Sequence, residues 1–217
     1  MYIGHYGVAY ALKKKNKQIP LWLLFIAVQF SDLLAFLLII LGIEKIQYTG
    51  GENPFFRTVI EYLPYSHSLI FNLIYALIIF LFFLKFKKKL WGMVLSIALL
   101  SHWFIDLLFQ DNNLPIFFDN YKIGFGLWNF PIFSFFSEII FIIITAYYIY
   151  KEYKIKSVSF FGLNLVMILY FSFIIFVPEP QYIQDSSALK ALVILIPYLL
   201  FTSIIYLIEK KEKFGQI

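Results

Sequence analysis

The stretch KFKKKLWGMVLSIALLSHWFIDLLF, residues 85–109, decides the fold class of this chain. Its first five residues include four lysines, and the apolar run 90–109 follows them. A run of about 20 residues is the length that crosses a membrane, because the hydrocarbon core is ~30 Å thick and a helix rises ~1.5 Å per residue. His102 and Asp106 lie inside this run. The stretch therefore predicts a spanning helix with a charged end and polar groups at membrane depth.

Five further runs of the same kind flank this one, so we expect an all-α integral membrane bundle of six transmembrane helices. The composition agrees, because 61% hydrophobic and 14% charged residues exclude an ordinary soluble protein. The expected spans, in one domain that takes in residues 1–217, are 20–43, 66–84, 90–109, 132–150, 158–177 and 190–208. The shorter apolar stretch 2–12 predicts either a half-helix that dips into the membrane or an interfacial segment.

Positive charge marks alternate ends of the expected spans. Most of the 18 Lys and Arg residues cluster at 13–17, 85–89, 151–156 and 210–213. By the positive-inside rule, this alternation places both termini in the cytoplasm. The net charge of +5 is therefore explained by topology and requires no nucleic-acid partner; the lipid bilayer is the expected partner. Two longer connections on the other side, 44–65 and 110–131, have the length of lids or binding segments.

A few ionisable side chains fall where lipid is expected, at a cost of several kcal/mol unless they are paired or hydrated. They are Asp32, His102, Asp106 and Glu138 inside the spans and His67 at the outer end of the second span. Counted from the lysines, all five lie about 18 to 27 Å up, in the outer half of the bilayer. His102 and Asp106 are four residues apart and share one helix face, the spacing at which a helix offers two ligands to one metal. His5 joins this group if residues 2–12 dip.

The side-chain types limit the chemistry. The chain has no cysteine and three histidines, so a metal site must use histidine and oxygen ligands. Such ligands suit catalytic Zn²⁺ and, on ligand type, Mn²⁺ or Fe²⁺. Water bound to the metal would ionise near neutral pH, and a spare carboxylate, Glu138 or Asp32, would act as general base. This predicts hydrolysis of a lipid-linked or amphipathic ester or phosphoester that enters from the membrane.

Two alternatives stay open. In a small permease, Asp32, Glu138 and the histidines would form a proton or cation pathway, because proton relays use the same residue types. In a structural protein, the polar side chains would only lock helix packing. A serine-nucleophile motif G-x-S-x-G and a P-loop are both missing from the sequence.

Several motifs carry a resemblance to a known family. They are S-D at 31–32, Y-S-H-S at 65–68, S-H-W-F-I-D at 101–106, and a short H-Y-G at 5–7 in place of H-x-x-G. Together they resemble the bacterial membrane-bound metal-dependent hydrolase-like family, over about residues 1–111. The later G-F-G-L-W-N at 124–129 is similar to a subgroup of small multi-span membrane proteins, some of them labelled permeases.

The resemblance implies a bacterial inner-membrane protein with a metal site. The matching metal-binding positions are His5, Asp32, His67, His102 and Asp106. Family members often carry two acids around the first-span position, whereas here Asp32 is present with Phe30 and Leu34 nearby. With one acid fewer, the resemblance is compatible with a single weak metal site or with none.

Overall fold

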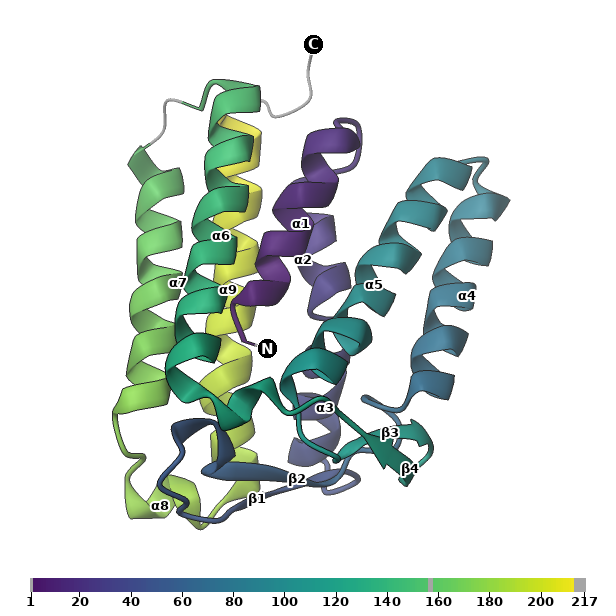
Figure 1. The fold of residues 1–217 in the computed structure, drawn as a ribbon. Helices are drawn as coiled ribbons and strands as arrows, with labels where there is room; N and C mark the ends of the chain where they lie inside the picture. Colours follow the sequence, from purple (N-terminus) through teal and green to yellow (C-terminus); the bar gives the residue numbers. More distant parts are fainter. Residues whose placement is uncertain (1, 156–157, 213–217) are drawn as a thin grey trace.

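The protein is a bundle of helices with two small β-hairpins at one end (Figure 1). A computed structural model describes residues 2–155 and 158–212. The helices are α1 (Gly4–Lys15), α2 (Leu21–Val28), α3 (Phe30–Ile40), α4 (Leu69–Lys85), α5 (Lys89–Phe109), α6 (Pro131–Tyr153), α7 (Val158–Phe176), α8 (Gln181–Gln184) and α9 (Ser187–Glu212). The other elements are β1 (Lys45–Tyr48), the 3-10 turn η1 (Pro54–Phe56), β2 (Thr58–Tyr62), β3 (Leu114–Phe117), β4 (Asn120–Ile123) and the 3-10 turn η2 (Leu127–Asn129).

The helix lengths confirm a membrane-type bundle but not six full spans. Among the described residues, α5, α6, α7 and α9 are long and apolar enough to cross a membrane. The expected first span is a broken one, because α2 and α3 meet at a 57° bend at Gln29 and make a fifth candidate only when taken together. The expected second span is the apolar helix α4, whose 17 residues lie at the lower limit for a crossing, so it is not among the four long candidates.

The two long connections depart from the all-α prediction. In the first, β1 and β2 form an antiparallel hairpin that pairs Tyr48 with Thr58. In the second, β3 and β4 pair Phe117 with Asn120 across a two-residue turn. Hydropathy did not indicate these strands, because each has only four or five residues. In Figure 1 both hairpins lie at the same end of the bundle and cover the helix ends there.

Helix α1 lies inside the bundle, next to α5 and α6 (Figure 1). His5, Tyr6 and Tyr10 are fully buried, at 0% exposure. At Gly7 the backbone of α1 comes so close to α6 that an added Cβ would lie 2.7 Å from the ring of Phe141. Of the two interpretations of residues 2–12, the structure therefore matches the buried half-helix.

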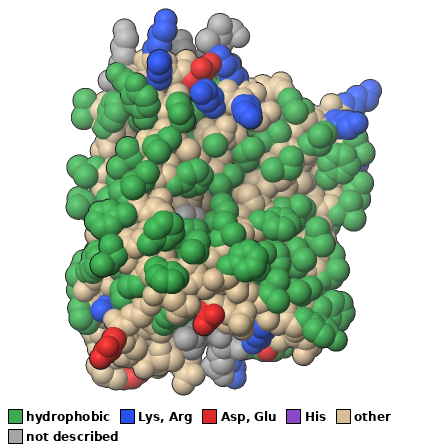
Figure 2. Space-filling model, viewed as in Figure 1, with side chains coloured by type: hydrophobic (Ala, Val, Ile, Leu, Met, Phe, Trp, Pro, Cys, Tyr) green, Lys and Arg blue, Asp and Glu red, His purple; other side chains and the backbone are tan. Residues whose placement is uncertain are grey.

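The outer surface is apolar along the flank of the bundle. Figure 2 shows hydrophobic side chains over this flank and lysine and arginine side chains gathered at the upper end. Large side chains such as Ile132 and Val158 are 76% and 83% exposed. Soluble proteins rarely leave continuous apolar surface of this kind in water, so the flank is suited to a lipid bilayer.

Candidate metal centre

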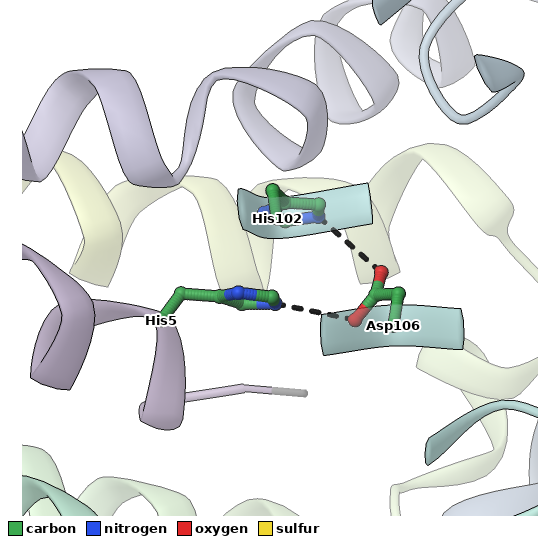
Figure 3. A group of neighbouring side chains, drawn as sticks. All are labelled: His5, His102 and Asp106. Atoms are coloured by element: carbon green, nitrogen blue, oxygen red, sulfur yellow. Dashed lines mark ion pairs between the residues drawn. The ribbon is translucent and has the colours of Figure 1, made fainter. Parts of the chain in front are cut away.

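The five residues predicted from the sequence as metal ligands come together inside the bundle. Asp106 Oδ1 lies 3.2 Å from His5 Nε2, and Asp106 Oδ2 lies 3.4 Å from His102 Nε2 and 3.8 Å from His67 Nε2. Asp32 Oδ1 lies 3.3 Å from His67 Nε2 and 3.5 Å from His102 Nε2. Figure 3 shows His5 and His102 both facing the carboxylate of Asp106. Residues far apart in the sequence thus place their ring nitrogens and carboxylate oxygens within a few ångströms of one another.

These separations match those of ligands around one ion. Two donors bonded to a metal at about 2.0–2.1 Å in tetrahedral geometry lie about 3.4 Å apart. Among the described residues, Nε2 of both His5 and His102 is buried without a hydrogen-bond partner. A buried polar atom without a partner is costly, and a cation between these nitrogens and the two carboxylates would satisfy all of them. The residues therefore fit a divalent metal.

The geometry favours one metal rather than two. Two sets of three residues, namely His5, His102 and Asp106, and Asp32, His67 and His102, each place their ligand atoms within 4.8 Å of one another. Both sets use His102. Because its Nε2 has a single lone pair, the two sets describe alternative parts of one centre.

The bend between α2 and α3 orients His102. Helix α2 ends at Val28, and the last carbonyls of a helix lack partners inside it. The Val28 carbonyl lies 2.7 Å from Nδ1 of His102. A carbonyl can only accept, so Nδ1 carries a proton, and in the neutral ring the lone pair is then on Nε2, toward the cluster. A backbone acceptor on the far ring nitrogen is a usual arrangement for metal-binding histidines.

The end of α5 orients Asp106. Gln110 Nε2 donates to Asp106 Oδ2 at 3.0 Å. The backbone N–H groups of Phe125 and Gly126 donate to the carbonyls of Leu107 and Gln110, both at 2.8 Å, and so cap the helix. The G-F-G-L-W-N stretch thus has a structural part in the site, because it holds the helix end that carries Gln110.

Glu138 lies beside the cluster rather than in either set of three. Its Oε2 accepts from the backbone N–H groups of Tyr2 and Gly4 at 2.9 and 3.0 Å. These bonds hold the first turn of α1 and therefore position His5. Ser134, Glu138 and Thr145 are all buried, so this face of α6 lies toward the interior of the bundle. The role of Glu138 as general base stays a prediction.

Sequence reasoning missed the residues that hold His67. Asn72 on α4 donates to the carbonyls of Ser66 and Ser68 at 2.9 and 3.0 Å and accepts from Ser31 Oγ at 2.6 Å. Glu44, only 1% exposed, accepts from the backbone N–H groups around His67. Asn72 was visible as a polar residue inside an apolar run. Glu44 was not, because it lies at the margin of a predicted span, where charge is common.

A pocket of about 110 Å³ borders the cluster. Asp32, His67 and Asp106 form its polar side, and apolar side chains of α3 and α9 form much of the rest. Lys190 also lines it, is only 6% exposed, and forms an ion pair with Glu179 at 2.7 Å. The pocket therefore combines the candidate metal ligands, a buried cation and apolar walls.

Comparison of this chain with models of protein families, with curated proteins and with solved structures found no match.

Proposed function

We propose that this chain is a metal-dependent hydrolase of the bacterial inner membrane, with a single divalent ion, Zn²⁺ in the first place and Mn²⁺ or Fe²⁺ as alternatives. The proposed ligands are His5, Asp32, His67, His102 and Asp106. The observation that carries the proposal is the convergence of three histidine nitrogens and two carboxylates at ligand-to-ligand distances. The resemblance to the membrane-bound metal-dependent hydrolase-like family supports the same residues.

When bound, such a metal supplies Lewis acidity and lowers the pKa of coordinated water. The residues of the chain would do the rest. Asp32 lines the pocket with 15% of its side chain exposed, so its carboxylate is placed to take a proton from an attacking water. Glu138 is fully buried and holds backbone N–H groups. We therefore place Asp32 ahead of Glu138 as the general base.

The lining of the pocket supports an anionic amphiphile as substrate. Lys190 stands in the first turn of α9, where the helix dipole disfavours a cation. The ion pair with Glu179 offsets this cost, and the buried ammonium group at the border of the pocket would also suit a phosphate or carboxylate group near the metal. Phe36, Ile39 and Tyr198 form apolar walls suited to an acyl or prenyl chain. A lipid-linked ester or phosphoester has both parts.

The proposed topology has six crossing segments. The bent pair α2–α3 and the short helix α4 would cross the bilayer together with the four long helices. The lysine-rich ends of α1 and α9 would lie in the cytoplasm, whereas Tyr2, the first described residue, lies inside the bundle beside Glu138 and does not reach that end. The hairpins and the pocket would then face the outer leaflet, where an amphiphilic substrate can enter from the side.

The test is metal content with two matched aspartates. The protein is purified in detergent without chelators, and bound metal is measured by elemental analysis in the wild type, Asp106→Asn and Asp111→Asn. Asp111 lies five residues further on and is exposed, so it controls for loss of an acid. We expect stoichiometric metal in the wild type and Asp111→Asn, and loss of metal and of lipid phosphoester hydrolysis in Asp106→Asn.

Other results would point elsewhere. A wild-type protein without metal would refute the proposal. Proton-coupled uptake into vesicles without hydrolysis of esters or phosphoesters would favour a permease. If neither activity occurs and His102→Ala and Asp106→Asn only lower thermal stability, the polar cluster serves packing.

A further inference from the structure

A buried chain of hydrogen bonds leads away from His67 on the side opposite the cluster. His67 Nδ1 lies 2.8 Å from Ser66 Oγ, and Ser66 Oγ donates to Glu44 Oε2 at 2.7 Å. The other oxygen of Glu44 accepts from the backbone N–H groups of Tyr65 and Ser66, both at 2.9 Å. Glu44 and Ser66 are 1% and 0% exposed, so water does not compete for these bonds.

The direction of this chain determines where the proton of His67 lies. A carboxylate only accepts hydrogen bonds, so the single hydroxyl proton of Ser66 points to Glu44. Ser66 Oγ is then left as an acceptor toward His67. We infer that Glu44 and Ser66 are positioning residues that place the proton of His67 on Nδ1, so that the lone pair of Nε2 faces Asp32 and Asp106. This inference rests on the proposed metal site.

His67 needs this arrangement because its other neighbours favour the opposite tautomer. Nε2 lies 3.3 Å from Asp32 Oδ1, and without a metal a proton on Nε2 would be donated to that carboxylate. A protonated Nε2 has no lone pair for a metal. His102 reaches the metal-binding tautomer through the carbonyl of Val28, whereas His67 reaches it through a serine and a glutamate.

The isosteric variant Glu44→Gln reverses the chain of hydrogen bonds. The amide oxygen can still accept from the two backbone N–H groups, but the amide N–H₂ now donates to Ser66 Oγ. Ser66 must then donate to Nδ1, and the proton of His67 moves to Nε2. In Ser66→Ala nothing contacts Nδ1 from this side, so Asp32 alone favours Nε2–H, whereas in Glu44→Gln Asp32 and Ser66 favour it together. The double variant Glu44→Gln/Ser66→Ala should therefore behave like Ser66→Ala and recover part of the metal affinity that Glu44→Gln loses.

The tautomer is read directly in metal-free protein. With ¹⁵N-labelled histidine, NMR shifts at pH 8 distinguish Nδ1–H from Nε2–H, and the chain has only three histidines to assign. We expect Nδ1–H at His67 in the wild type and Nε2–H in Glu44→Gln. Zn²⁺ affinity, measured by competition, should fall about 100-fold in Glu44→Gln and about 10-fold in Ser66→Ala and in the double variant, the range seen when partners of metal ligands are removed.

Ser68→Ala is the matched control. Ser68 is equally buried and two residues away, and its hydroxyl has no hydrogen-bond partner among the described residues. Ser68→Ala should leave both the tautomer of His67 and the Zn²⁺ affinity unchanged. If Glu44→Gln fails to fold, Ser66→Thr is compared with Ser66→Ala, and because it keeps the hydroxyl it should also leave the tautomer and the affinity unchanged. An unchanged tautomer in Glu44→Gln, or Nε2–H in the wild type, would overturn the inference even if metal binds. The expected tautomers in a protein that binds no metal would uphold it while the hydrolase proposal fails.

Discussion

Glu138 positions His5, the candidate metal ligand that comes first in the sequence. Its carboxylate binds the N–H groups of Tyr2 and Gly4, and His5 follows directly in α1. An anion at the N-terminus of a helix is favourable because the first N–H groups lack partners and the dipole is positive there. A carboxylate that looked catalytic in the sequence therefore has a positioning part in the structure.

Substitutions at Glu138 separate these two functions. In Glu138→Gln the amide oxygen can still accept both N–H groups, so metal affinity and thermal stability should stay close to the wild type. Glu138→Ala should lower both, because each hydrogen bond to a charged group contributes roughly 1.5–3 kcal/mol. Metal competition and thermal unfolding in detergent measure the two effects.

Glu152→Ala is the control on the same helix, since Glu152 pairs with Lys17 near the surface, at 2.6 Å, and should leave metal binding unchanged. If Glu138→Gln binds metal normally but no longer hydrolyses a lipid phosphoester, Glu138 is the general base and our preference for Asp32 is wrong.

The site residues could be found from the sequence because an acid or histidine inside an apolar run is expensive and rare. Their partners could not be found in this way. Glu138 and Gly4 are 134 positions apart, and nothing local to either residue indicates the contact. Ser66 was noticed only as the neighbour of His67, and its hydrogen bond to Glu44 depends on how α3 leads into the first hairpin.

At the scale of elements, the bend at Gln29 was the least predictable feature. Residues 20–43 are apolar apart from Gln29, Ser31 and Asp32 and contain no glycine or proline between 21 and 41, so their pattern predicts one straight helix. The bend is held instead by tertiary contacts: Gln29 Nε2 donates to the carbonyl of Tyr2 at 3.2 Å, and the carbonyl of Val28 receives the ring of His102. The same break both shortens the helix and provides an acceptor for the site.

A substitution at Gly124 tests whether the loop that caps α5 positions the side chain of Asp106. A Cβ at Gly124 would overlap the backbone oxygens of Gln110 and Asp111, and backbone atoms cannot move aside as a side chain can. Gly124→Ala should therefore separate the loop from α5, release Gln110 from its position beside Asp106, and weaken Zn²⁺ binding about 10-fold. Competition titration gives the affinity, and thermal unfolding shows how much of the effect is global.

Gly162→Ala provides the comparison, because a Cβ there meets no atom within 4 Å. It should bind metal like the wild type. Normal metal affinity in Gly124→Ala would mean that the capping loop does not position Asp106.

At the scale of the whole molecule, the charge pattern separates the two ends of the bundle. Most of the lysine and arginine side chains visible in Figure 2 lie at the upper end, and the hairpins lie at the lower end in Figure 1. Charge and hydropathy were enough to indicate a helical, membrane-type protein, and the direction in which its helices cross the membrane stays a prediction. Charge and hydropathy could not predict the hairpins, because their pairing depends on contacts between short strands that a helical hydropathy pattern does not indicate.

The absence of cysteine makes the orientation easy to measure. Single cysteines are introduced as Lys151→Cys at the lysine-rich end and Asn120→Cys on the exposed first residue of β4. In intact cells, a membrane-impermeant maleimide should label Asn120→Cys only, and disruption of the cells should make Lys151→Cys reactive as well. The reverse pattern would place the hairpins and the pocket in the cytoplasm.

The contact between α1 and α6 also sets an order of events during biosynthesis. Gly4 leaves the ribosome 134 residues before Glu138, which at 5–20 residues per second is roughly 7 to 27 s earlier. Until α6 has entered the membrane, the half-helix has no anchor and His5 has no fixed place. A nascent chain that stalls or misinserts before α6 would lack a complete set of ligands. If the proposed metal site is correct, the metal would then be captured only by chains whose insertion has passed that stage.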